Sequence, residues 1–169
     1  FLYVGLREPA ISADGAALAY TSDANSSTLL ADWGTGAQPG SYATSNVFVW
    51  DRTNIDRNTN VRRISNSLSG DNGESYSPTV SGNGEFVAFV STTTSLVAGA
   101  QLPACNPECT PQVYLFHRAD GALTLASRVA GDTSVPPVAA DVAATQPVLN
   151  HDGDELLYVM AADRLAMRQ

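Results

Sequence analysis

The stretch Glu8-Pro-Ala-Ile-Ser-Ala-Asp-Gly15 decides the fold, because closely similar stretches occur twice further along the chain. It returns as Ser77-Pro-Thr-Val-Ser-Gly-Asn-Gly84 and as Gln146-Pro-Val-Leu-Asn-His-Asp-Gly153, each time 69 positions later. An apolar run follows every copy. A spacing that is kept twice is typical of a repeat protein, in which each repeat is one structural unit.

Each full repeat contains four segments with the composition of short strands. Asp-Gly or Asn-Gly between apolar runs favours a tight β-hairpin turn, because glycine tolerates a positive φ. The runs are rich in Val, Phe, Tyr and Leu, as strands are, and none shows a helical period. We name the segments a to d. After the a segment they are Ala17–Ser22, Asn46–Arg52 and Val61–Ser65 in the first repeat, and Phe86–Ser91, Gln112–Arg118 and Leu123–Val129 in the second.

Four-stranded antiparallel sheets that repeat radially form a β-propeller. The succession of Pro-x-x-Ser-x-Asp-Gly, a strand ending in Phe/Tyr-x-Ser, Val-Phe-Val-x-Asp-Arg and Arg-x-Ser resembles the TolB-type, WD-repeat-like β-propeller repeat of bacteria. About half of the chain carries this resemblance. Two places depart from it: His117 stands where the first repeat has Asp51, and Asn150-His151 replaces Ser-Ala or Ser-Gly.

The repeats predict an all-β chain with about two and a half propeller blades in one continuous domain. We expect blade one at 7–66, blade two at 76–130 and a partial blade three at 145–169. Residues 1–6 are expected to be the outer strand of a preceding blade. Because a propeller closes with about four to eight blades, the ring would be completed by further copies or by the rest of a longer propeller. A self-contained β-sandwich is the alternative.

Charge and missing motifs exclude several functions. The 9 basic residues, all arginine, face 17 acidic ones, a net charge of −8, which is unsuited to nucleic acid or to an anionic membrane surface. No apolar run reaches the roughly 18 residues of a membrane span. The G-x-S-x-G nucleophile elbow, the P-loop and H-E-x-x-H are absent from the sequence.

Cys105 and Cys109 are the only cysteines. A zinc site needs about four ligands, and only two histidines accompany them. A redox motif would be C-x-x-C, one residue shorter. We therefore expect a small disulfide that fixes a proline-rich loop, with free thiols as the alternative. A disulfide indicates an extracellular, periplasmic or cell-surface protein.

The longest connections lie between segments b and c, at 23–45 and 92–111, and between d and the next a, at 66–75 and 130–145. The resemblance implies that all of them emerge on one face, and long loops on one face of a repeat protein indicate an interaction face. Trp33, Tyr42, Asp32 and Asp71 are the candidate contacts, since aromatics in a glycine-rich loop suit a sugar or a protein. The alternative is that Trp33 and Tyr42 cover a blade edge.

The sequence predicts no cofactor, and the alternative is calcium, with oxygen-ligand candidates at Asp23, Asp32 and Asp71. None of these has EF-hand spacing, and Asp-Asn-Gly is also an ordinary turn. His151 is expected in a surface turn, and His117 as a hydrogen-bonding residue at a strand end. Four arginines recur at matching positions and predict ion pairs or hydrogen bonds between strands, with an anion track as the alternative: Arg52, Arg63, Arg118 and Arg128.

These observations predict a non-enzymatic module outside the cytoplasm that binds protein or glycan through its long loops. A rival is a structural subunit of a surface or filamentous polymer, completed by strands of neighbouring copies. A second rival is a glycosidase or lyase fragment. That reading needs acid and base residues near the propeller axis, where the a segments offer mainly Ile11, Ser12, Val80, Ser81 and Leu149.

Overall fold

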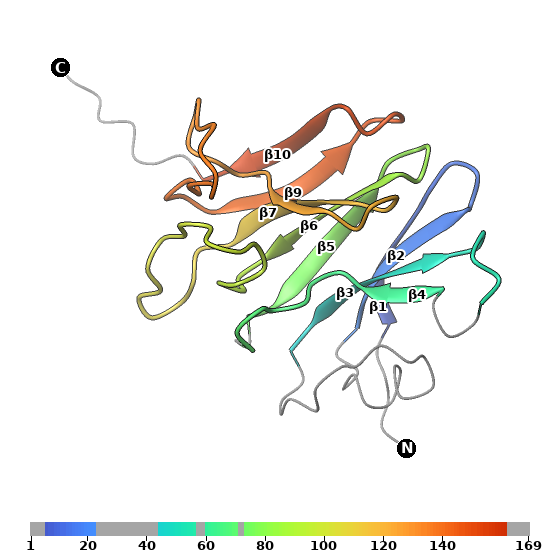
Figure 1. Cartoon of the computed structure of the whole chain (residues 1–169), viewed down its shortest axis with the longest axis horizontal. Helices are drawn as coiled ribbons and strands as arrows, with labels where there is room; N and C mark the ends of the chain where they lie inside the picture. Colours follow the sequence, from blue (N-terminus) through green and yellow to red (C-terminus); the bar gives the residue numbers. More distant parts are fainter. Residues whose placement is uncertain (1–5, 23–43, 57–59, 71–72, 162–169) are drawn as a thin grey trace.

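The computed structural model describes residues 6–22, 44–56, 60–70 and 73–161, which form ten strands and contain no helix (Figure 1). Nothing in these ranges is a helix long and apolar enough to cross a membrane. The strands are β1 (Leu6–Ile11), β2 (Ala17–Ser22), β3 (Asn46–Asp51), β4 (Val61–Arg63), β5 (Ser75–Val80), β6 (Phe86–Ser91), β7 (Gln112–His117), β8 (Leu123–Leu125), β9 (Ala144–Leu149) and β10 (Leu156–Met160).

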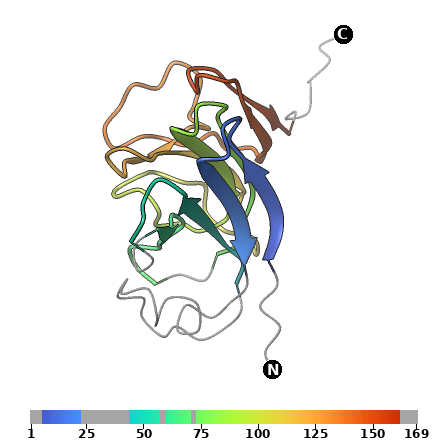
Figure 2. The ribbon, with the colours of Figure 1, turned by 90° about the vertical axis from the view of Figure 1, so that its right-hand side faces the viewer.

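The described strands form three antiparallel sheets that follow one another along the chain. Sheet one has the order β1-β2-β3-β4, sheet two β5-β6-β7-β8, and sheet three the pair β9-β10. The sheets stack face to face, with β5 packed between sheet one and β9. Figure 2 shows β1 and β2 nearest the viewer, with sheet three at the other end of the stack. The predicted fold of four-stranded antiparallel blades, about two and a half in number, is confirmed. Of the predicted outer strand at 1–6, residues 1–5 lie outside the described ranges, and Leu6 begins β1 of sheet one.

The same backbone irregularity occurs in the first strand of every sheet. Glu8, Ser77 and Gln146, each before a proline, have φ of 52°, 50° and 53°. A left-handed conformation in a non-glycine residue costs roughly 1–3 kcal/mol and persists where the surrounding structure fixes it. One such fixing contact is visible, because the Ser77 amide of sheet two donates to Glu8 Oε2 of sheet one at 2.8 Å. The repeated sequence is therefore also a repeated backbone.

The Ser-x-Asp-Gly motif closes the turn between the first two strands of a sheet. Ser12 Oγ donates to Asp14 Oδ1 at 2.7 Å and accepts from the Ala17 amide at 3.0 Å. Ser81 makes the same pair of bonds in sheet two. In sheet three, Asn150 Oδ1 instead accepts from the amides of Gly153 and Glu155. The departure at Asn150 thus preserves the turn with a different side chain.

The core consists of two layers between stacked sheets. We call the face of a sheet toward the preceding sheet its upstream face, and the other its downstream face. Between sheets one and two, the aliphatic downstream residues Ala19, Val47, Val49 and Ile64 meet the upstream residues Val87, Phe89, Tyr114 and Phe116, all buried. Between sheets two and three, Val90 and Val113 meet Ala144, with Leu156 and Tyr158 packed alongside. Stacking of faces therefore buries the apolar strands.

Candidate functional site

The candidate site lies at the end of the strands from which the long connections emerge, and the three sheets share this side of the molecule. Because consecutive strands are antiparallel neighbours, every second connection leaves the same edge. The connections at 64–74 (described at 64–70 and 73–74), 92–111 and 126–143 share it, and the tight turns leave the opposite edge (Figure 1). We call the first the long-loop edge and the second the turn edge.

Hydrogen bonds join these three connections to one another. The Leu68 amide donates to the Ser95 carbonyl at 2.9 Å, and Ser69 Oγ donates to Ser95 Oγ at 2.7 Å. The Gln101 amide donates to the Pro137 carbonyl, and the Ala139 amide returns a bond to the Gln101 carbonyl, both at 2.9 Å. Segment 92–111 is thus fixed on both sides, and the three connections form one surface.

Beneath this surface lies a buried polar network that recurs in both four-stranded sheets. In sheet two, Ser127 Oγ donates to Gln112 Oε1 at 2.6 Å, and Gln112 Nε2 donates to the Ala140 carbonyl at 3.1 Å. In sheet one, Ser65 Oγ donates to Asn46 Oδ1 at 3.0 Å. Since a buried polar group is costly without a partner, these bonds fix where the connections leave the strands.

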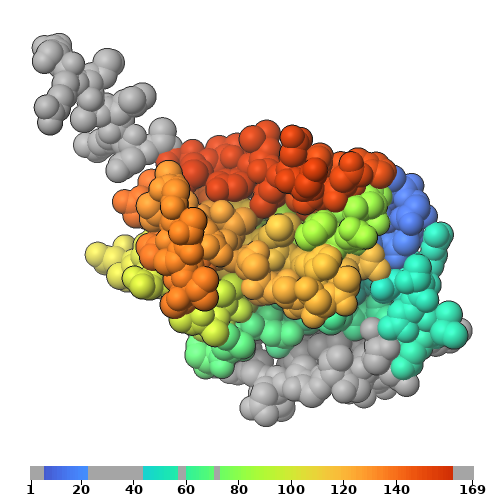
Figure 3. Space-filling model, turned by 45° about the horizontal axis from the view of Figure 1, so that its top comes forward, coloured from blue at the N-terminus to red at the C-terminus, as the bar shows by residue number. Residues whose placement is uncertain are grey.

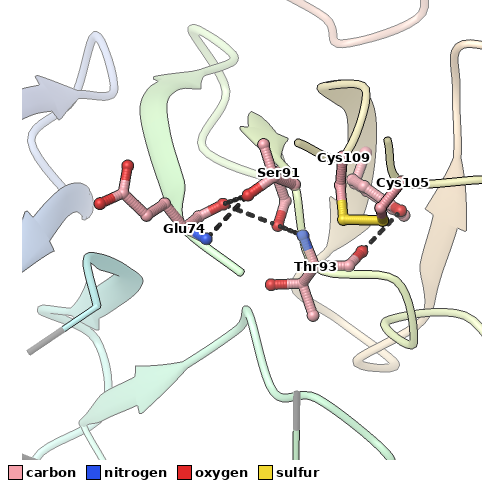
Figure 4. Close-up of a disulfide and its surroundings, with 7 residues drawn as sticks. Glu74, Ser91, Thr93, Cys105 and Cys109 are labelled. Carbon is pink, nitrogen blue, oxygen red and sulfur yellow. Dashed lines mark hydrogen bonds between the residues drawn. A yellow bond between two sulfur atoms is a disulfide. The ribbon is translucent and has the colours of Figure 1, made fainter. Parts of the chain in front are cut away.

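The predicted disulfide between Cys105 and Cys109 is present in segment 92–111. Figure 4 draws it with Glu74, Ser91 and Thr93, which form the entrance to this loop. Ser91 Oγ donates to the Glu74 carbonyl and accepts from the Thr93 amide, each at 3.0 Å. The loop is therefore held at its entrance by hydrogen bonds and further along by a covalent bond.

Asp132 organises the connection from sheet two to sheet three. Its Oδ1 accepts from the Ser134 hydroxyl at 2.6 Å and the Ser134 amide at 3.1 Å, and its Oδ2 accepts from the Val138 amide at 2.9 Å. These bonds stabilise the carboxylate and hold the pKa of Asp132 below its usual value. Beside them the apolar side chain of Val135 is 93% exposed, on a segment whose shape is fixed.

The turn edge carries two of the four recurring arginines, Arg52 and Arg118, and for these two the predicted ion pair and hydrogen bonds are confirmed. Arg52 donates to the Asp14 carbonyl in the β1–β2 turn of sheet one at 3.0 Å. Arg118 donates to the Gly84 carbonyl in the β5–β6 turn of sheet two. Arg118 also pairs with Asp51 of sheet one at 2.6 Å, which links the two sheets. Partial burial raises the pKa of Asp51, but hydrogen bonds from Thr53 and Arg118 outweigh it, and the pKa lies below its usual value.

The other predicted structural roles are local. Arg63 donates to the Asn66 side chain, and Arg128 Nε donates to the Leu125 carbonyl at 3.1 Å. Both bonds join residues three positions apart, so the prediction of bonds between strands is wrong for these two arginines. His117 Nδ1 lies 2.9 Å from Asp120 Oδ1, so this histidine does hydrogen-bond at a strand end. His151 is exposed in its turn, with Nδ1 2.8 Å from Asp152 Oδ1.

The residues predicted to contact a ligand lie outside the described ranges, and so do all the calcium candidates: Asp23, Asp32, Trp33, Tyr42 and Asp71. They remain predictions. Within the described part of the chain, no group of three or more His, Cys, Asp or Glu side chains is placed to hold a metal ion. Sequence reasoning missed Ser95, Gln101 and Gln112. Only Gln112 left a signal, because Asn46 and Gln112 begin matching strands.

Sheets of four antiparallel strands, stacked face to face in chain order, define this chain as a set of β-propeller blades. No family model matches the sequence, and no curated protein matches it. Among solved structures, the chain is similar to TolB from Acinetobacter baumannii, with a TM-score of 0.43 and 16% identity. The likeness covers 90% of this chain and 26% of that one, so the chain spans about a quarter of that protein's length.

Proposed function

We propose that this chain is a non-enzymatic propeller module that binds another protein or a glycan through its long-loop edge. The observation that carries the proposal is the joining of segments 64–74, 92–111 and 126–143 by hydrogen bonds through Ser95 and Gln101. Loops with a fixed shape lose less conformational entropy when they bind a partner. A ligand would therefore meet a surface that is already ordered.

Exposed apolar side chains on this edge support the same function. Leu68, Val129 and Val135 are all exposed there, one on segment 64–74 and two on segment 126–143. Apolar groups displayed on a rigid polar surface are suited to the central contacts of an interface, or to packing against a sugar ring. The acidic composition would keep such a surface soluble and would favour a neutral or cationic partner.

The location outside the cytoplasm is proposed from the Cys105–Cys109 disulfide. Structural disulfides persist in oxidising compartments and are rare where glutathione and thioredoxin keep thiols reduced. The exposed position of Cys105 supports this inference, since an exposed disulfide is accessible to cellular reductants.

The test uses two exposed apolar positions on opposite edges. Val135 on the long-loop edge is 93% exposed, and Ile55 in the β3–β4 connection on the turn edge is 94% exposed. The biotinylated chain is applied to a glycan array and to an array of purified bacterial envelope proteins. We expect binding that Val135→Arg reduces at least tenfold and Ile55→Arg leaves unchanged. Absence of binding on both arrays, or equal loss in the two variants, would overturn the proposal.

A further inference from the structure

The two ends of the sheet stack present apolar faces whose counterparts inside the molecule are buried. On the upstream face of sheet one, a groove of about 230 Å³ is lined mainly by apolar side chains. Those that the argument uses are Leu6, Leu18, Tyr20, Trp50 and Val61.

The repeat shows what such a face packs against. Leu18 and Tyr20 correspond to Val87 and Phe89, which are fully buried against sheet one. The aromatic pairs correspond too: Tyr20 stacks on Phe48 with ring centres 5.6 Å apart, and Phe89 stacks on Tyr114 at 5.8 Å. The same surface is thus built twice, once covered by a sheet and once lining a groove.

At the other end of the stack, sheet three presents a downstream face, which is the kind of face that covers an upstream face inside the molecule. On sheet three, Leu157 pairs with Val148 on one face, with Val159 further along, and all three are exposed. Val159 corresponds to Val90 of sheet two, which is fully buried against sheet three. Figure 3 shows sheet three in red as the top of the molecule, with no other described segment above it.

At the turn edge, Arg52 supplies a positive charge on sheet one, next to the Asp14 carboxylate, where an acidic turn of another sheet could dock. Within the molecule, the β1–β2 turn of sheet one lies beside the β5–β6 turn of sheet two, since the Ala13 amide donates to the Gly82 carbonyl at 2.9 Å. The turn of a docked sheet three would therefore lie beside the turn of sheet one, which Arg52 contacts. That incoming turn carries Asp152, Asp154 and Glu155, all exposed.

We propose that the upstream face of sheet one receives the downstream face of sheet three of a second copy. Sheets would then stack between copies as they stack within one, with an acidic turn beside Arg52. The two surfaces are different patches of the molecule, so the contact is head-to-tail and produces a ring or an open chain of copies. It uses neither Ser95 nor the connections at the long-loop edge, so it stands independently of the proposed function.

The test measures the native mass of the 169-residue chain by light scattering over a concentration series. Multiples of 17.7 kDa are expected. Leu6→Glu, combined with Arg52→Glu, blocks the upstream face, and Leu157→Glu, combined with Val159→Glu, blocks the downstream face. Each double variant should raise the concentration for half-association at least tenfold, and Ile55→Glu should not. Far-UV circular dichroism checks that every variant is folded.

The decisive step mixes the two blocked variants. Each keeps one intact face, so a head-to-tail contact predicts a 1:1 dimer from two chains that are each monomeric alone. Three results would overturn the proposal: a wild-type chain that stays monomeric throughout, a mixture that does not pair, or an Ile55→Glu variant as impaired as the blocked ones. Loop-edge binding by the monomeric variants would show that the two proposals succeed or fail separately.

Discussion

At the scale of single residues, Arg118 makes both a hydrogen bond within its own sheet and an ion pair with the neighbouring sheet, whereas its counterpart Arg52 makes only the hydrogen bond among the described residues. Both side chains donate to a turn carbonyl, but only Arg118 also pairs with the carboxylate of Asp51 in the neighbouring sheet. We expect Arg118→Ala to lower the free energy of unfolding by about 1–3 kcal/mol, and Arg52→Ala to lower it less. In a double-mutant cycle with Asp51→Ala, the coupling should be about 0.5–1 kcal/mol, because the pair is partly exposed. Urea unfolding measures the four proteins of the cycle together with Arg52→Ala, and a coupling of zero would show that the pair does not stabilise the contact between the sheets.

Asp132 gives the long-loop edge a dependence on pH. Its folded pKa is lowered by the bonds from Ser134 and Val138, whereas in the unfolded chain it returns to about 3.8. A lowered carboxyl pKa contributes stability that is complete above the unfolded value and is lost as pH falls through the folded one. The unfolding free energy of the wild type should therefore exceed that of Asp132→Asn at pH 6, and the difference should shrink steadily below pH 3.8. Urea titrations from pH 6 to pH 2.5 test this, and a constant difference would contradict it.

At the scale of elements, matching strands allow a comparison within one chain. Phe89 on β6 is fully buried between sheets, whereas its counterpart Tyr20 on β2 is half-buried beside the open groove. Removal of a buried aromatic side chain costs about 3–5 kcal/mol. We expect Phe89→Ala to fall in that range and Tyr20→Ala to cost less than half as much, at concentrations where the chain is monomeric. Equal losses would indicate that the upstream face of sheet one is covered.

The elements themselves were predictable because their signals are local. The Asp-Gly and Asn-Gly turns and the apolar runs marked all ten strands, and the repeat gave their order. The joints between elements were harder to predict. Ser95 and Gln101 hold the long connections largely through backbone atoms, and backbone hydrogen bonds leave no mark on residue identity. The matching positions of Asn46 and Gln112 at the start of their strands were the one signal of the buried polar network. That signal does not name the partner, because Gln112 and Ser127 are 15 residues apart in the sequence.

At the scale of the whole molecule, stability should be graded along the stack. The amides of β6 lie in a strand with neighbours on both sides and a buried layer on each face, whereas β10 pairs only with β9 among the described strands. Amides in the least buried elements exchange through local openings, and those in the core exchange only through larger ones. Hydrogen exchange followed by mass spectrometry should therefore show β6 as the slowest segment and β10 as the fastest strand in the monomer.

Hydrogen exchange measured at several protein concentrations tests how copies of the molecule associate. If a second copy covers the downstream face of sheet three, exchange in β10 should slow as the chain is concentrated, while exchange in β7 and β8 should not change. The variant with Leu157→Glu and Val159→Glu should lose this concentration dependence and keep the monomer's rates in β6. Protection of β10 that is already equal to that of β6 in the dilute monomer would contradict the grading, because it would mean that the open end of the stack is covered within a single chain.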